Sequence, residues 1–228
     1  MSRLGNVLIL GDSYSTFEGH IPAGYVPYYA PKSRPEIDTD VKTVEQTWWH
    51  QLIAETDSRL ILNCSWSGTT VCNTGHGGRD ASEWSFVARL DQLIEKGFFE
   101  ENKIDTLLLY GGINDSAAHS PLGELQYSDW NRADLYNALP AFCYLLWRTK
   151  QCLQGTRVVC MINPTIKPPY ADGYRAACAH YDVECVDLVD LDIKNSHPTV
   201  QGMVEIKDQL LDYFKNNRLH QIAGEEQP

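Results

Sequence analysis

The segment Val7-Leu-Ile-Leu10 is an apolar run of strand length, and the polar sequence Gly11-Asp12-Ser13-Tyr14-Ser15 follows it directly. Similar runs recur at residues 60–64, 106–110, 157–162 and, with the weakest pattern, 183–187. The first four runs are almost continuously apolar, which is typical of parallel strands buried on both faces. The sequence therefore predicts a central parallel sheet of about five strands.

Segments with helical spacing of apolar residues separate these runs. They cover residues 44–54, 82–94, 133–153, 174–180 and 198–214. Strands that alternate with helices imply a parallel sheet with helices on both faces, joined by right-handed crossovers. We expect a single three-layer α/β/α domain over residues 1–222 and a flexible tail over residues 223–228. The proline-rich interval 19–40 is predicted to be a long surface loop, and such loops are often functional.

The composition argues against several classes of protein. Of the 228 residues, 19 are Lys or Arg and 30 are Asp or Glu, so the formal net charge is −11. A protein this acidic is a poor partner for nucleic acid or for an anionic membrane. No apolar run approaches the roughly 20 residues that span a bilayer, and the first residues lack the apolar core of a signal peptide. We therefore expect a cytoplasmic protein.

The cysteines indicate reduced thiols and not a disulfide framework. The chain has seven of them, an odd number, and no Cys-x-x-Cys motif, and several lie inside apolar runs. The Cys and His spacings match no zinc template, and no metal ion or organic cofactor is implied.

Residues that could take part in catalysis or binding follow the predicted strands. Ser13 follows the first run, Gly68 the second and Asn114 the third, while His197 precedes the last predicted helix. In open parallel sheets, ligands bind beyond the carboxyl ends of the strands. Each residue also has a structural interpretation, because Ser and Asp cap helices, Gly and Asn form turns, and a surface His is common.

Taken together and in this order, the residues resemble the SGNH (GDSL-type) hydrolase family. The matching elements are Gly11-Asp12-Ser13, Gly68, Gly112-Ile113-Asn114-Asp115 and His197-Pro198. The resemblance implies a flavodoxin-like α/β/α fold and an esterase that works through an acyl-enzyme. It implies that Ser13 is the nucleophile and His197 the general base. The main-chain N–H groups of Ser13 and Gly68 and the side chain of Asn114 would then form the oxyanion hole.

The sequence departs from the family at one catalytic position. The family usually has an Asp three residues before the His, and this chain has Lys194 there. Three alternatives follow. Asp192 orients the His197 ring, a backbone carbonyl orients it and leaves a Ser–His dyad, or the site is degenerate.

The substrate is predicted only by class. Tyr25 and Trp66 lie in loops expected around the site, and their rings suit stacking on a sugar or an apolar acyl group, although ordinary burial is an alternative. With Asp12, next to the expected nucleophile, they are the candidate substrate-binding residues. We expect a small-molecule or glycan ester with a short acyl group. A non-catalytic carbohydrate-binding protein on the same fold is the alternative, whereas a nucleotide- or flavin-binding protein is disfavoured because no Gly-rich phosphate motif follows a strand.

Overall fold

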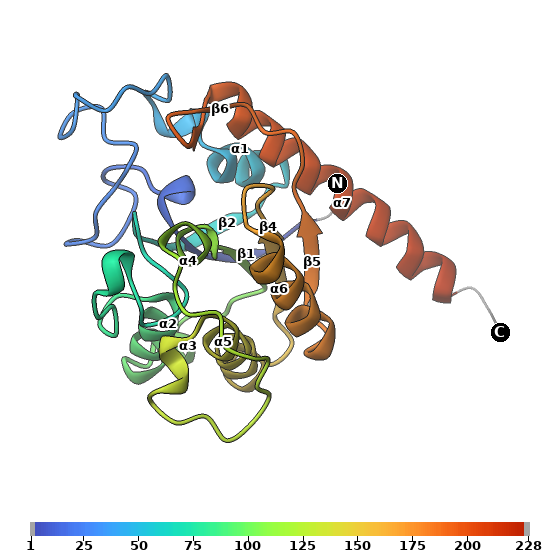
Figure 1. Cartoon of the computed structure of the whole chain (residues 1–228). Coiled ribbons are helices and arrows are strands. Elements are labelled where there is room, and N and C mark those ends of the chain that lie inside the picture. The colour runs from blue at the N-terminus through green and yellow to red at the C-terminus, as the bar shows by residue number, and fades with distance from the viewer. Residues whose placement is uncertain (1–2, 226–228) are drawn as a thin grey trace.

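A five-stranded parallel sheet forms the centre of the computed structural model, which describes residues 3–225, with side chains up to residue 217 (Figure 1). The strand order is β2-β1-β3-β4-β5, and all neighbouring pairs are parallel. The strands are β1 (Asn6–Gly11), β2 (Arg59–Ser65), β3 (Thr106–Tyr110), β4 (Arg157–Ile162) and β5 (Glu184–Asp187). The predicted sheet is confirmed, with strand limits that differ by no more than one residue.

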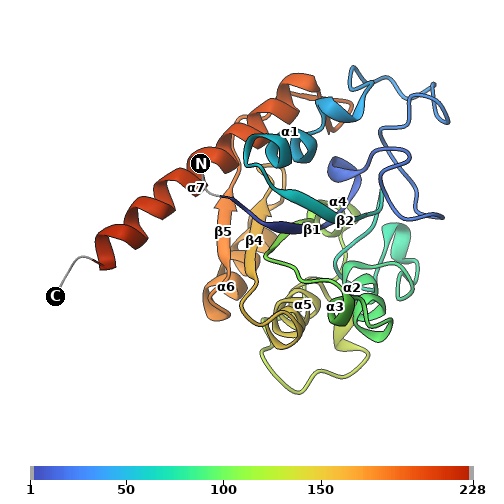
Figure 2. The same cartoon turned by 180° about the vertical axis from the view of Figure 1, so that it is seen from behind.

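Helices cover both faces of the sheet (Figures 1 and 2). On one face lie α1 (Trp48–Glu55) and α7 (Val200–Glu225), and on the other lie α2 (Phe86–Glu95), α5 (Ala138–Cys152) and α6 (Pro168–His180). The two short helices are α3 (Phe98–Glu101) and α4 (Ile113–Ala118). The three-layer α/β/α architecture is therefore confirmed.

Strand β1 shows why the apolar runs are continuous. Leu8 and Leu10 belong to the apolar core that includes α2, α5 and α6, whereas Val7 and Ile9 belong to the core that includes α1 and α7. Alternate side chains of a strand point to opposite faces, so a strand covered on both faces needs an apolar residue at every position.

Several helices begin at other residues than the sequence predicts. Helix α2 begins at Phe86, where the Ser85 hydroxyl accepts a hydrogen bond from the N–H of Ala88. Helix α6 begins already at Pro168, since proline is tolerated in the first helical turn, where the N–H groups have no partner within the helix. The predicted segments 44–54 and 133–153 each divide into a short 3₁₀ helix (Val44–Gln46; Asp134–Tyr136) followed by α1 or α5.

The last helix is preceded by a hairpin that the sequence does not predict. Strands β6 (Ile193–Lys194) and β7 (His197–Pro198) pair antiparallel, and the turn residues Asn195 and Ser196 have φ values of 50° and 62°. Pro198 therefore lies in a strand, and α7 begins at Val200 rather than at Pro198. The hairpin fixes the direction of His197.

Helix α7 is long, and its C-terminal half extends away from the sheet (Figure 1). Residues 223–225 of the expected tail belong to this helix, and residues 226–228 lie outside the described residues. Among the described residues, no helix is both long and apolar enough to cross a membrane. All seven cysteines are unpaired, and five of them are buried.

The carboxyl ends of three adjacent strands lie level with one another. Gly11 is in register with Ser65 of β2 and with Tyr110 of β3. The segments that follow β1, β2 and β3 therefore leave the sheet side by side at one edge. These segments carry Ser13, Gly68 and Asn114.

Candidate active site

Ser13 begins a tight 3₁₀ turn (Ser13–Ser15) that follows β1 directly. The carboxylate of Asp12 accepts a hydrogen bond from the N–H of Tyr14 at 3.1 Å, so Asp12 caps this turn. Gly11 is required next to it, because a Cβ there would lie 2.6 Å from the Ser65 hydroxyl. The structural interpretation of this segment as a cap is thus correct, and the capped turn fixes Ser13 at the edge of the sheet.

Asp12 itself is 0% exposed, whereas Ser13 is 6% exposed. A substrate therefore has no access to the Asp12 carboxylate. The prediction that Asp12 binds substrate is not met, because the capping role turns its side chain into the protein.

The hydroxyl of Ser13 meets the imidazole of His197, with Oγ and Nε2 2.9 Å apart. The other ring nitrogen, Nδ1, lies 3.1 Å from the carbonyl oxygen of Asn195. A carbonyl oxygen only accepts hydrogen bonds, so Nδ1 carries the proton of the neutral ring. Nε2 is then an acceptor and receives the hydrogen bond of the Ser13 hydroxyl. This is the tautomer that a general base needs.

The carboxylate of Asp192 lies at another place. It accepts a hydrogen bond from the hydroxyl of Thr199, and the Asp192 carbonyl accepts from the Thr199 N–H at 3.1 Å. Asp192 therefore supports the start of α7 and does not contact the ring of His197, contrary to the first of the three alternatives. Lys194, at the family's Asp position, points outward and pairs with Asp38 at 2.8 Å. The backbone carbonyl of Asn195 occupies the orienting position instead.

Aromatic rings enclose His197. Tyr28 stacks on the imidazole with a centroid distance of 3.4 Å and an interplanar angle of 8°, and Tyr14 lies at 5.3 Å. Burial lowers the pKa of His197 below its usual range, and the hydrogen bond to the Asn195 carbonyl opposes this shift. Within the described residues no carboxylate is bonded to the ring, so the neutral form is favoured near neutral pH.

Gly68 lies on an exposed turn after β2, with φ of +75° and open space around it. A left-handed backbone of this kind favours glycine. Within the described part of the chain, the N–H groups of Gly68 and Ser13 donate no hydrogen bond to another protein group. These two main-chain N–H groups thus remain available as hydrogen-bond donors.

Asn114, in the first turn of α4, has a fixed carboxamide. Its nitrogen donates to the carbonyl of Thr69 at 3.0 Å and lies 3.4 Å from the carboxylate of Asp12, while its oxygen bonds to Nε2 of His76 at 3.0 Å. Because 3.4 Å is a long hydrogen bond, the second N–H of Asn114 is only weakly engaged. The amide nitrogen therefore lies beside Asp12, the residue before Ser13, and its weaker hydrogen bond is the one to the Asp12 carboxylate.

The buried side chain of Arg89 supports this arrangement, and no sequence pattern indicates this role. The side chain is 1% exposed and donates to the carbonyls of Gly11 and Cys64 and, at 3.0 Å, to the hydroxyl of Thr69. It thus connects the ends of β1 and β2 to the turn that carries Gly68. Burial raises the pKa of Asp12 to about 7, and the charge of Arg89 opposes this shift.

Two cavities flank the candidate site. One, of about 390 Å³, has lining residues from four loop segments, namely Val26, Trp66, Ser67, Gly68, Thr69, Gly75, His76, Arg79 and Trp84. The other, of about 450 Å³, is lined by Tyr14, Ile113, Ser116, Ala117, Thr165, Lys167, Ile193 and Ser196. We call them the tryptophan cavity and the Tyr14 cavity.

The candidate aromatic residues lie at the tryptophan cavity. Trp66 lines it, and Tyr25 stacks against Trp66 with a centroid distance of 4.3 Å but is not a lining residue. Tyr25 therefore supports Trp66 instead of facing the cavity. His76 lines the same cavity and forms a hydrogen bond with the side chain of Asn114. The two residues are far apart in the sequence, so no local pattern indicates this contact. As far as the structure describes the chain, no three His, Cys, Asp or Glu side chains are grouped closely enough to hold a metal ion.

The comparisons with known proteins agree with the architecture. The GDSL-like lipase/acylhydrolase family matches residues 5–214. The structure is similar to a protein of Bacteroides ovatus ATCC 8483 described as a GDSL-like lipase, with 37% identity and a TM-score of 0.87 over 95% of this chain and 100% of that chain. A protein of Bacteroides uniformis ATCC 8492 with the same description has 39% identity and a TM-score of 0.87, over 93% of this chain and 96% of that chain.

A more distant likeness concerns the fold alone. A family two carbohydrate esterase from Clostridium thermocellum, in complex with cellohexaose, has 13% identity and a TM-score of 0.62 over 95% of this chain and 65% of that chain. No curated protein matches the sequence at a significant level. The match over residues 5–214 and the two Bacteroides structures confirm the resemblance seen in the sequence, and the chain belongs to the GDSL-like lipase/acylhydrolase family of ester-hydrolysing enzymes.

Proposed function

We propose that the protein is a serine esterase that removes a short acyl group from a carbohydrate or a similar polar scaffold. Ser13 is the nucleophile and His197 the general base. The observation that carries this proposal is the 2.9 Å contact between Ser13 Oγ and His197 Nε2, in the tautomer that the Asn195 carbonyl imposes. A serine hydroxyl is a weak nucleophile and requires a base within this distance.

In the first half-reaction, Ser13 Oγ attacks the ester carbonyl and its proton passes to His197 Nε2. Negative charge develops on the carbonyl oxygen, where the N–H groups of Ser13 and Gly68 and the amide of Asn114 stabilise it. Loss of one such donor typically costs about 10²–10³ in kcat. When the carbon–oxygen bond to the alcohol breaks, His197 returns the proton to the leaving oxygen.

In the second half-reaction, water attacks the acyl-enzyme. His197 Nε2 takes a proton from the water, and the acid leaves as Ser13 Oγ regains a proton. During both steps the imidazolium is held by its Nδ1–H bond to the Asn195 carbonyl, 3.1 Å away in the structure. This carbonyl orients the ring but carries no full charge, so the protein works as a Ser–His dyad.

Two observations support a short acyl group on a polar alcohol. The two cavities have modest volumes of about 390 and 450 Å³. The tryptophan cavity combines two indole rings with polar loop atoms, a lining that suits a sugar. The Clostridium thermocellum esterase of the same fold was solved with cellohexaose, which is compatible with this class.

The test is labelling with a fluorophosphonate, located by peptide mass spectrometry, together with turnover of 4-nitrophenyl acetate. We expect stoichiometric labelling at Ser13 and turnover in the wild type, and loss of both in His197→Ala. Ser13→Ala remains folded and inactive. Absence of labelling in a folded wild-type protein would contradict the proposal and favour a non-catalytic carbohydrate-binding protein with a degenerate site.

A further inference from the structure

The tryptophan cavity contains one permanent charge. Among its described lining residues Arg79 is the only arginine or lysine, and no carboxylate is among them. This is unusual for the protein as a whole, whose formal net charge is −11. The general field of an acidic protein repels anions, so a local cation beside the site changes which substrates are accepted there.

The loop that presents Arg79 is held by its own hydrogen bonds. The N–H of Gly75 donates to the Arg79 carbonyl at 2.8 Å, and Thr74 and Asp80 form an isolated antiparallel bridge across the base of the loop. Nε of Arg79 donates to the carbonyl of His76 at 3.2 Å. The guanidinium is thereby anchored through one nitrogen only.

Within the described part of the chain, the Arg79 side chain makes this one hydrogen bond through Nε, and its two terminal nitrogens have no protein partner. A planar guanidinium with two such nitrogens matches a carboxylate, which it binds through two parallel hydrogen bonds. The side chain is exposed, so a bound anion reaches it from the cavity without burial of an unpaired charge.

The cavity is connected to the catalytic residues through short contacts. His76, whose carbonyl anchors Arg79, bonds through its ring to Asn114 at 3.0 Å. Gly68 and Thr69 also line the cavity, and Gly68 supplies a proposed oxyanion donor. A molecule in this cavity therefore lies beside the reacting carbonyl group.

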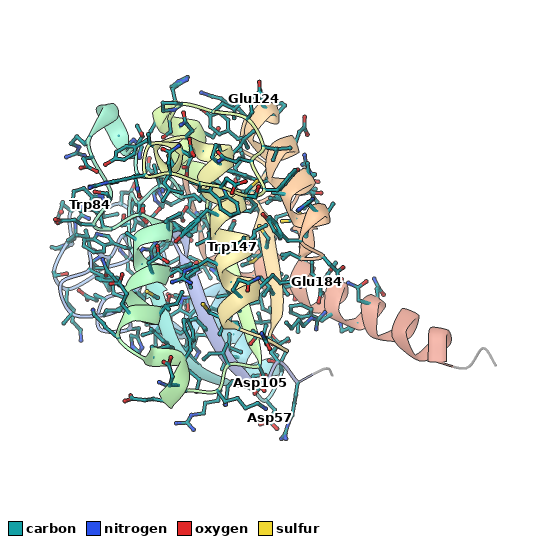
Figure 3. The ribbon with its side chains drawn as sticks, turned by 90° about the horizontal axis from the view of Figure 1, so that it is seen from below. Asp57, Trp84, Asp105, Glu124, Trp147 and Glu184 are labelled. Atoms are coloured by element: carbon teal, nitrogen blue, oxygen red, sulfur yellow. The ribbon has the colours of Figure 1, made fainter. Side chains whose placement is uncertain are left out.

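Two indole rings provide the apolar surface. Trp66 and Trp84 both line the cavity, and Tyr25 stacks on Trp66, which fixes the plane of this indole. Figure 3 shows Trp84 at the margin of the molecule, on the opposite side from Glu184. Rigid aromatic faces of this kind bind the C–H face of a sugar ring.

We infer that the tryptophan cavity binds the alcohol portion of the substrate and that this portion is an acidic sugar, whose carboxylate pairs with Arg79. This inference rests on the proposed function, because it assigns a substrate class to the same esterase site. The indole rings take the ring of the sugar and Arg79 selects its charge. A dicarboxylic acyl group is the other source of a carboxylate, and it offers no ring for the indoles.

The experiment compares acetyl esters of a methyl glucuronoside and of the matching methyl glucoside. We expect the wild type to favour the uronide by about tenfold in kcat/KM, as for a charge-assisted hydrogen-bonded pair. Arg79→Gln should lower this ratio to near one. Arg59→Gln is the matched control, because Arg59 is exposed at the start of β2, at the opposite edge of the sheet, and should leave ratio and rate unchanged.

The outcomes separate this inference from the proposed function. The inference is wrong if the wild type hydrolyses 4-nitrophenyl acetate but has equal kcat/KM for both sugar esters, or if Arg79→Gln keeps the preference for the uronide. In either case the proposed esterase function still holds. A preference for succinyl over acetyl esters without any preference for uronides also overturns it. If no ester is hydrolysed, calorimetric titration with methyl glucuronoside decides: binding that Arg79→Gln abolishes supports the acidic-sugar site, and no binding refutes it.

Discussion

The imidazole of His197 lies flat against the phenol ring of Tyr28, with centroids 3.4 Å apart and planes inclined by 8°. This stack and the Asn195 carbonyl at Nδ1 are the contacts that set the ring's orientation. Tyr14 adds a third restraint, since its hydroxyl donates to the Ser196 carbonyl at 2.7 Å and holds the hairpin turn. Packing and main chain thus replace the carboxylate that the family usually provides.

Replacement of Tyr28 tests whether the stack positions the base. Tyr28→Ala should lower kcat on 4-nitrophenyl acetate by about 2- to 10-fold, because an aromatic pair contributes roughly 0.5–1.5 kcal/mol. Tyr28→Phe retains the ring and should behave as the wild type. KM should change little in either variant, since Tyr28 lines neither cavity. Equal kcat in all three proteins would show that the stack has no role in catalysis.

The pH profile gives a second, independent measure of the same contact. The base acts when neutral, so the acidic limb of kcat/KM should lie below the ordinary His pKa of about 6.5, because burial lowers the pKa of His197. Tyr28→Ala admits water to the ring and should move this limb upward, towards 6.5. The measurement is kcat/KM between pH 4 and pH 9. A wild-type limb above 6.5 would mean that a negative charge stabilises the imidazolium.

Asp192→Asn distinguishes the dyad from a triad. Asp192 bonds to Thr199 at the start of α7 and not to His197, so we expect kcat within twofold of the wild type. The free energy of unfolding should fall by about 0.5–1 kcal/mol, because an exposed charge-assisted hydrogen bond is weakened. Urea denaturation and steady-state kinetics measure the two effects. A loss of kcat by a factor of about 10² or more, with unchanged stability, would place Asp192 in the catalytic machinery.

The sheet and the strand-end residues could be predicted because both leave a local signal. Residues 7–10 face two cores and are therefore all apolar. The ends of β1 and β3 are level in register, so the segments that carry Ser13 and Asn114 leave the sheet at the same edge, although they are far apart in sequence. Strand order alone is sufficient to bring them to the same edge.

The surroundings of His197 could not be predicted in this way. The hairpin turn uses Asn195 and Ser196 at positive φ, without the glycine that usually marks such a turn. Tyr28 lies in a proline-rich loop without periodicity, so nothing local shows that its ring reaches His197. Asp192 is near His197 in sequence, but the hairpin carries it towards Thr199 instead. These contacts depend on tertiary structure, which one sequence does not encode locally.

The buried carboxyl of Asp12 should make stability depend on pH. Burial raises its pKa to about 7, compared with about 3.9 in the unfolded chain, so the folded protein binds this proton more tightly. The contribution of Asp12 to the free energy of unfolding is therefore greatest below about pH 4. It decreases from pH 4 to pH 7 and is constant above pH 7. Asp12→Asn keeps an oxygen for the Tyr14 N–H and removes the titration. The Tm of the wild type should accordingly fall, relative to the Tm of Asp12→Asn, as the pH rises from 4 to 7.

Asp38→Asn is the contrast, because the pair with Lys194 lowers the pKa of Asp38, and the advantage of the wild type over that variant is lost as the pH falls below about 4. Parallel Tm curves for wild type and Asp12→Asn would mean that Asp12 titrates in the folded protein as it does in the unfolded chain.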